Sequence, residues 1–204
     1  LLTLRSEVLV RRARNYTKTA RRYEAFWMFY DLVVENPKDP QTEFFTYATF
    51  SNALHLNKTD TAITVGKSYR SQFPQGEYYS DITIALVSTL KDGDADNAEY
   101  IQIAKDFLDS RPLDTASSNM LAVWAGNKME NALFEEIIQQ CNSWLNLHQN
   151  SIFEDGLFYW CGISELQTSQ FADAIQSFDS LLQQYPTSLY AEDGLLRKGA
   201  AQFY

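Results

Sequence analysis

The sequence predicts an all-α fold in which about five helix pairs follow one another along the chain as a helical solenoid. Three observations predict it: stops at a regular interval, apolar positions that recur in register before each stop, and a lack of strand patterns. Four stops are Pro37, Pro74, Pro112 and Pro186, and a fifth is expected at Gln149, the midpoint of the interval between Pro112 and Pro186. The period is therefore about 37 residues, within the range typical of stacked helical repeats.

The side chains before each stop predict the second helix of each pair. Four recurring positions step by one, three and three residues, which places them on one face of an α-helix. Five residues before the stop stand Leu32, Tyr69, Phe107, Trp144 and Leu181. Eight before it stand Phe29, Gly66, Ala104, Cys141 and Phe178, eleven before it Phe26, Ile63, Ile101, Ile138 and Ile175, and twelve before it Ala25, Ala62, Tyr100, Ile137 and Ala174. A proline then ends the helix.

The first helix of each pair is expected before a short polar break. Twenty-four residues before the stop, where the two helices would approach closely, stand Ala13, Phe50, Ser88, Ala125 and Gly162, and only Phe50 is large. The segment ITIALV at 82–87 fits as a first helix instead of a strand. We predict one solenoid over residues 1–204, with units at about 1–37, 38–74, 75–112, 113–149 and 150–186 and the first helix of a sixth at 189–204. The chain stops in mid-pattern, so we expect it to be part of a longer protein.

Composition and charge favour a folded, soluble domain with a basic N-terminal segment and an acidic remainder. The chain has 45% apolar and 21% charged residues and no apolar window long enough to span a membrane. Its net charge is −9, but residues 1–22 carry seven basic groups and one acidic group, or +6, which leaves −15 elsewhere. Arg11, Arg14, Lys18 and Arg22 would share one helix face, the basic stripe. This stripe is either a docking site for an acidic partner, lipid headgroups or nucleic acid, or an ordinary solvated face. Since the acidic remainder would repel a polyanion, no nucleic-acid partner is expected.

Catalytic chemistry is not indicated. The two histidines, His55 and His148, lie where helices end, and the sequence contains none of the short motifs that mark zinc proteases, serine hydrolases or nucleotide-binding loops. Cys141 and Cys161 have no metal-binding spacing; they are either two small buried side chains or a disulfide. The sequence therefore predicts no enzyme activity, no cofactor and no metal.

The fifth unit resembles a known family. Residues 158–188, FYWCGISELQTSQFADAIQSFDSLLQQYPTS, resemble a tetratricopeptide repeat, with Phe158, Gly162, Ala174, Phe178 and Pro186 at its signature positions. The ending YPTSLYAEDGLLRKG and the period near 37 are similar to the repeats of the bacterial outer-membrane assembly lipoprotein and the periplasmic Tol-Pal coordinator. The resemblance implies a right-handed solenoid whose concave groove binds an extended or helical peptide, without catalysis. It also implies a periplasmic or outer-membrane location.

If the family's register holds, the groove-facing positions of the first helices can be named. They are Phe44, Tyr47, Ser51 and Leu54 in the second unit and Tyr159, Ile163 and Leu166 in the fifth. A register shifted by one residue would instead place them in the packing between helices. The Lys and Asn set with which related domains bind chaperone tails is absent, because its positions hold Val10, Arg14 and Ala48.

The function predicted is a non-catalytic scaffold that binds a peptide segment or partner helix, in the cell envelope of a Gram-negative-type bacterium. The alternative is a repeat segment of a larger regulatory or enzymatic protein whose activity lies outside these residues. A third hypothesis is self-association through the helix at 189–204, where Leu195, Leu196 and Phe203 lack a following partner. Membrane association is expected only through an anchor outside the sequence.

Overall fold

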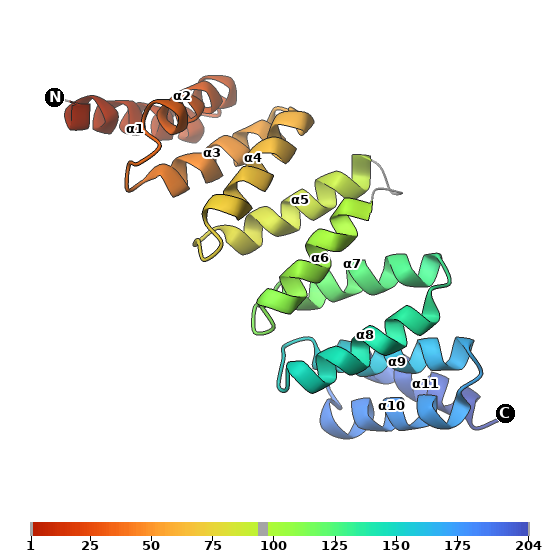
Figure 1. Ribbon diagram of the computed structural model, residues 1–204. Helices are drawn as coiled ribbons and strands as arrows, with labels where there is room; N and C mark the ends of the chain where they lie inside the picture. The colour runs from red at the N-terminus through yellow and green to blue at the C-terminus, as the bar shows by residue number, and fades with distance from the viewer. Residues whose placement is uncertain (1, 94–97, 204) are drawn as a thin grey trace. The chain divides into compact units, whose positions relative to one another are not determined.

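A computed structural model describes residues 2–93 and 98–203 of the chain (Figure 1). Within these residues it contains eleven α-helices and no strand, so the predicted all-α helical solenoid is confirmed. The helices are α1 (Leu2–Lys18), α2 (Arg22–Glu35), α3 (Thr42–His55), α4 (Thr59–Gln72), α5 (Tyr79–Gly93), α6 (Ala98–Ser110), α7 (Ser117–Glu130), α8 (Phe134–Leu147), α9 (Glu154–Gln167), α10 (Phe171–Gln184) and α11 (Ala191–Ala201).

The stops set the helix boundaries. The helices α2, α4, α6, α8 and α10 each end two residues before a stop, and the helices α3, α5, α7, α9 and α11 each begin five residues after one. At four of the five stops proline, which has no backbone N–H and restricts the residue before it, prevents the helix from continuing, and the chain turns into the next pair; the fourth stop, Gln149, has the same spacing without a proline. The last helix is shorter than the segment 189–204 expected from the sequence.

The chain divides into two compact units. Residues 1–100 form unit 1, which holds α1 to α5, and residues 101–204 form unit 2, which holds α7 to α11 and most of α6. In unit 1 each helix from α1 to α5 packs against the next along the chain. In unit 2 the same is true from α7 to α11, and α9 also contacts both α7 and α11. Unit 1 holds the cavity described below.

The apolar columns form the core. All five side chains at each of the positions five, eight and twelve before the stop are buried. At the position eleven before the stop only Phe26 is buried, while Ile63, Ile101, Ile138 and Ile175 are half-buried. The second helices therefore bury three of the four predicted positions in the core, and the position eleven residues before the stop lies at the edge of the core.

Phe50 is large because its neighbour is small. A Cβ atom on Gly66 would come within 2.9 Å of Cε2 of Phe50, and a Cβ atom on Gly162 within 2.8 Å of the Phe178 ring. The positions 24 and 8 residues before the stop thus face each other. In the second repeat the ring, Phe50, is on the first helix, and in the fifth repeat the ring, Phe178, is on the second helix. Packing density requires one large and one small side chain at this contact but leaves their order free.

The prediction that Ser88 lies at this close approach was wrong. Ser88 is exposed, and the buried residue at the corresponding place is Val87. Val87 stands 13 residues after Pro74, the same distance at which Phe50 follows Pro37 and Ala125 follows Pro112. The buried Tyr100 stands 12 residues before Pro112, as expected for a second helix. The one extra residue of the third repeat therefore lies between Val87 and Tyr100, a segment that includes residues 94–97, outside the described part.

The turns within four of the pairs share one backbone device. Ala20, Asn57, Ala132 and Ser169 each stand 17 residues before a stop and have φ angles between 53° and 61°. The next amide reaches back to a carbonyl five residues earlier, as from Lys58 N to Ala53 O at 2.9 Å. This left-handed residue closes the first helix and reverses the chain.

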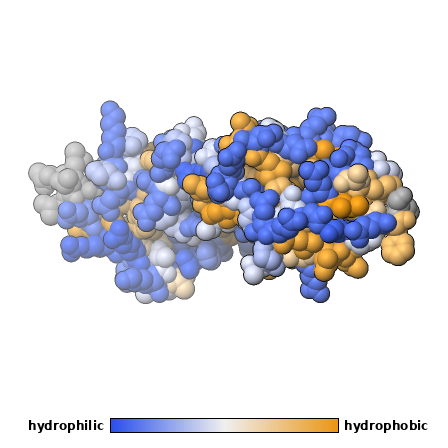
Figure 2. All heavy atoms as spheres, turned by 90° about the horizontal axis from the view of Figure 1, so that it is seen from below, coloured by the Kyte–Doolittle hydropathy of each residue, from blue (hydrophilic) through white to orange (hydrophobic). Residues whose placement is uncertain are grey.

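None of the described helices is long and apolar enough to span a membrane. On the face seen in Figure 2, polar residues cover much of the surface and apolar residues show between them.

Candidate functional site

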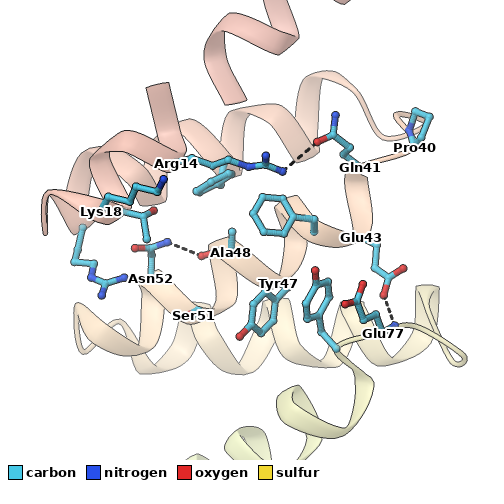
Figure 3. A pocket seen from close by; sticks show the side chains of 15 residues that line it. Arg14, Lys18, Pro40, Gln41, Glu43, Tyr47, Ala48, Ser51, Asn52 and Glu77 are labelled. Carbon is cyan, nitrogen blue, oxygen red and sulfur yellow. Dashed lines mark hydrogen bonds between the residues drawn. The ribbon is translucent and has the colours of Figure 1, made fainter. Parts of the chain in front are cut away.

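A cavity of about 640 Å³ opens in unit 1 (Figure 3). Its walls come from α1, α2, α3 and the loop that leads into α5. One end carries basic side chains, the middle aromatic rings and the other end two glutamates. We call it the unit-1 groove.

The basic end is formed by Arg14 and Lys18 of α1 and Arg22 of α2. The Arg14 guanidinium lies 4.8 Å from the centroid of the Phe44 ring, and its Nη2 donates a long hydrogen bond of 3.5 Å to Oε1 of Gln41. Among the described residues, no carboxylate pairs with any of these three cations. Their charges therefore remain available to an anionic group.

The aromatic middle is a stacked pair. Tyr47 of α3 and Tyr78, which directly precedes α5, lie face to face with ring centroids 4.1 Å apart and planes at 12°. The Phe44 ring lies 6.4 Å from Tyr78, measured between centroids. Burial, and then the nearby charges of Glu77 and Glu43, raise the pKa of Tyr78, so its hydroxyl stays protonated. The pair offers a flat apolar surface with two hydroxyls.

A hydrogen-bond network fixes the acidic end. Oε1 of Glu43 accepts from the Tyr69 hydroxyl and from the Glu77 amide, each at 2.6 Å. The Tyr69 hydroxyl in turn accepts from the Tyr78 amide at 3.0 Å. In other repeats a side chain two residues after the stop accepts this amide hydrogen bond, as Ser188 does for Tyr190 N at 3.1 Å. After Pro74 this position holds Gly76, which leaves room for Oε1 of Glu43 and for the Tyr69 hydroxyl, and that hydroxyl accepts the amide hydrogen bond instead.

Asn52 lines the groove with an unsatisfied acceptor. The residue is only 2% exposed, and its Nδ2 donates to Ala48 O at 2.7 Å. Its Oδ1 is buried and has no hydrogen-bond partner among the described residues. A buried acceptor without a partner costs about 1–3 kcal/mol, so such atoms mark places where a further donor would stabilise the protein.

The structure brings most of the residues predicted for this region together. Phe44, Tyr47 and Ser51 line the groove with Arg14, Lys18 and Arg22. Leu54 is half-buried and Arg11 is exposed, and neither is a lining residue. Asn52, Glu77 and Tyr78 were not predicted to line a groove, because Asn52 lies off the predicted face of its helix and Glu77 and Tyr78 follow a stop.

The residues predicted for the fifth repeat lie in a different setting in unit 2. Tyr159 stacks on Tyr190 with centroids 4.5 Å apart, and its hydroxyl donates to Oδ2 of Asp193 at 2.6 Å. Ile163 is buried in a cluster with Ala174 and Phe178. Leu166 packs against the same cluster. Of these three predicted residues, only Tyr159 has a polar group that could serve a ligand, and that group is already bonded.

Both cysteines are buried and free. Cys161 Sγ donates to Oε1 of Glu165 at 3.3 Å, and Ser177 Oγ donates to Oε2 of Glu165 at 2.7 Å. Burial raises the pKa of both thiols and of the Glu165 carboxyl. Protonated, enclosed thiols are poor nucleophiles, so these cysteines act as core side chains.

Two further features concern metal binding and the last helix. In residues 2–93 and 98–203, no three His, Cys, Asp or Glu side chains are grouped so that they could hold a metal ion. Leu195, Leu196 and Phe203 are exposed on and after α11, and self-association through this helix stays a prediction.

Comparison with known proteins supports the fold. No protein-family model matches the chain, and a search of curated proteins found no match. The structure is similar to that of a tetratricopeptide repeat protein from Parabacteroides merdae, with a TM-score of 0.56, 12% identity and coverage of 97% of this chain and 72% of that one. It is also similar to the C-terminal part of a tetratricopeptide-repeat-containing protein from Cytophaga hutchinsonii, with a TM-score of 0.55, 20% identity and coverage of 94% and 69%.

Proposed function

We propose that this chain, which has the fold of tetratricopeptide-repeat proteins, is a non-catalytic scaffold whose unit-1 groove binds a segment of another protein. The single observation that carries the proposal is the unsatisfied acceptor of Asn52 in a cavity of about 640 Å³. An extended peptide has a free backbone N–H at nearly every residue, and a helix has free N–H groups in its first turn, so either kind of segment in the groove could supply the missing donor.

The side chains of the groove favour a particular kind of segment. The three cations at one end have no carboxylate partner among the described residues and so attract carboxylates, and arginine can bind a carboxylate through two parallel hydrogen bonds. The stacked rings of Tyr47 and Tyr78 provide a surface for an aromatic side chain or a proline. We therefore expect acidic residues near α1 and a flat apolar residue against the tyrosine pair.

Selection from a displayed peptide library on the purified chain tests this proposal. Selected peptides are titrated against wild type, against Arg14→Glu with Lys18→Glu, and against a matched control, Arg11→Glu with Arg12→Glu. The control reverses the same number of charges on α1 outside the groove. We expect the groove variant to bind about tenfold or more weakly, which is about 1.4 kcal/mol, and the control to bind about twofold weaker at most.

Two results would contradict the proposal. One is a library that yields no enriched peptide on the wild-type chain. The other is an equal loss of binding in the groove variant and its control, since a general charge effect would then account for the attraction.

We further propose that the scaffold works in cell-envelope assembly. The support is the resemblance of residues 155–204 to the repeats of the outer-membrane assembly lipoprotein and the Tol-Pal coordinator. Fractionation of the cells that make the full protein checks this location. We expect it with the periplasm or outer membrane, and recovery with cytosolic proteins would contradict an envelope role while leaving groove binding in place.

A further inference from the structure

The outer face of α2 carries four exposed apolar side chains in one stripe. Tyr23 is 57% exposed, Trp27 42%, Tyr30 38% and Val34 62%. They follow one another at intervals of four, three and four residues, the spacing with which one helix packs along another. With a rise of 1.5 Å per residue the stripe is about 16 Å long, or three helical turns. We call it the α2 stripe.

The other repeats show that the fold does not require apolar residues at the positions of the α2 stripe. The α2 stripe occupies the positions 14, 10, 7 and 3 before the stop. The same positions are almost all polar in the later repeats, with alanine as the only apolar residue: Asp60, Thr64, Lys67 and Ser71 in α4, Ala98, Gln102, Lys105 and Asp109 in α6, Glu135, Gln139, Asn142 and Asn146 in α8, and Ala172, Gln176, Asp179 and Gln183 in α10. All of these side chains are exposed or half-buried. The first repeat alone presents large apolar groups at these solvent-facing positions.

The rings of the α2 stripe are packed against one another. Trp27 makes edge-to-face contacts with Tyr23 at 6.3 Å and with Tyr30 at 5.8 Å, measured between ring centroids. Trp27 also contacts the buried Phe26 at 5.1 Å. These contacts order the exposed rings, so a partner would meet a ridge that loses little side-chain freedom on binding.

Charges flank the α2 stripe asymmetrically. Asp31 and Glu35 lie along one edge, are exposed, and form no ion pair within the described part of the chain. Glu24 on the same edge is neutralised by Arg21 at 2.5 Å. On the Phe26 side, the Lys58 ammonium lies 5.9 Å from the centroid of the Trp27 ring. A partner would therefore need cations opposite Asp31 and Glu35.

We infer that the α2 stripe docks an amphipathic helix of a second protein, one with an apolar stripe at intervals of three and four residues and basic residues on the edge that meets Asp31 and Glu35. A second copy of this chain fits less well, because antiparallel two-fold pairing of α2 would set the Asp31 and Glu35 edge against itself. The same carboxylates would be repelled by an anionic membrane. This inference is independent of the unit-1 groove, since none of the four stripe residues lines it.

Two designed helices of 21 residues test the inference on the whole chain. Both carry leucine at the stripe positions; one has lysines along the edges and the other glutamates. Titration is followed by peptide fluorescence anisotropy. The stripe variant Tyr23→Glu, Trp27→Gln, Tyr30→Asn, Val34→Asn installs the residues of α8, and Gln139→Ala with Asn146→Ala is the control at equivalent positions of α8. Asp31→Lys with Glu35→Lys changes only charge.

The expected result is that the lysine-edged helix binds wild type and the α8 control at least about tenfold more tightly than the glutamate-edged helix. The stripe variant should lose this binding while keeping its helicity and melting curve, and the Asp31, Glu35 variant should prefer the glutamate-edged helix. If the stripe variant does not fold, Trp27→Gln alone and the charge variant provide the same comparison.

Three results would overturn the inference: equal binding of both helices to wild type, unchanged binding by the folded stripe or Trp27→Gln variant, or no binding at all. A dimer of the wild type that the stripe substitutions dissolve would assign the surface to a second copy instead. Stripe-dependent binding to vesicles of neutral lipid, without peptide binding, would assign it to a membrane.

Discussion

Tyr47 with Tyr78 in unit 1 and Tyr159 with Tyr190 in unit 2 are equivalent pairs, each separated by 31 residues and stacked at 4.1 Å and 4.5 Å between centroids. In unit 2 the hydroxyl of Tyr159 is bonded to Asp193, and Arg197 pairs with the same carboxylate. In unit 1 no hydrogen bond joins the Tyr47 hydroxyl to any described residue.

The two units differ in the side chain that pairs with this aspartate. The equivalents of Asp193 and Arg197 in unit 1 are Asp81 and Ala85. Ala85 cannot pair with a carboxylate as Arg197 does, and Asp81 is exposed and forms no ion pair with any described residue. The same repeat geometry therefore yields an aromatic pair whose hydroxyl is bonded by Asp193 of α11 in unit 2, and a pair that faces the unit-1 groove in unit 1.

The largest expected effect tests the scaffold that positions both pairs. Trp144 is fully buried, and its Nε1 donates to Oδ1 of Asp109 at 2.5 Å. Trp144→Ala removes a large core side chain, so we expect a loss of about 3–5 kcal/mol in the free energy of unfolding, measured by denaturant titration. An unchanged unfolding midpoint would mean that the column five residues before the stop does not hold unit 2 together.

A smaller effect should separate the two pairs directly. Tyr159→Phe removes the hydrogen bond to Asp193 and should destabilise the protein by about 1 kcal/mol. Tyr47→Phe removes no hydrogen bond to a described residue, so its unfolding free energy should change by less than about 0.5 kcal/mol. Equal losses in the two variants, measured by urea unfolding, would contradict the distinction between the two pairs.

Alkaline pH sharpens the same contrast. Burial, and then the hydrogen bond to Asp193, raise the pKa of Tyr159 to about 12. Because the ordinary pKa of tyrosine is about 10, the stability that this hydroxyl contributes is fully present below pH 10 and is lost as the pH rises toward 12. The difference in unfolding free energy between wild type and Tyr159→Phe should therefore shrink across this range. A difference that is constant from pH 8 to 11.5 would show that the pKa of Tyr159 is not raised in the folded protein.

The smallest effect on stability is expected at Asn52. Asn52→Leu keeps the branched shape of the side chain. It removes the Nδ2 hydrogen bond to Ala48 O, which destabilises the protein, and a buried acceptor without a described partner, which stabilises it. Because the two changes have opposite signs, the unfolding free energy should stay within about 0.5 kcal/mol of wild type. Binding of a selected peptide should weaken in the same variant. A clear loss of stability with unchanged peptide binding would make Asn52 a structural residue.

The fold was largely predictable because each proline stop and the core columns before it are local features. The third repeat shows the limit: its extra residue moved the helix–helix contact from Ser88 to Val87, and counting back from Pro112 could not detect where the insertion lies. The exchange of ring and glycine between Phe50 with Gly66 and Gly162 with Phe178 is likewise visible only when both helices are in place.

The candidate site was predictable only in part. Periodicity found Tyr47 and Ser51 on α3 and the cations of α1, since they repeat along single helices. It could not find Tyr78, which comes from the loop before α5, or the unsatisfied state of Asn52, which depends on what the neighbouring helices leave unpaired. It also could not show that the Tyr159 hydroxyl is bonded to Asp193, 34 positions further along the chain and on another helix.

The central claim, that the unit-1 groove is open for a protein ligand, is tested most directly by site-specific photo-cross-linking of the full protein in the cells that make it. A cross-linking residue replaces Ser51 in the groove or, as control, Thr64 on the exposed face of α4. We predict adducts with one protein segment at Ser51, fewer of them when Arg14→Glu and Lys18→Glu are added, and no such adduct at Thr64. No adduct at Ser51, or the same adducts at both positions, would contradict the claim.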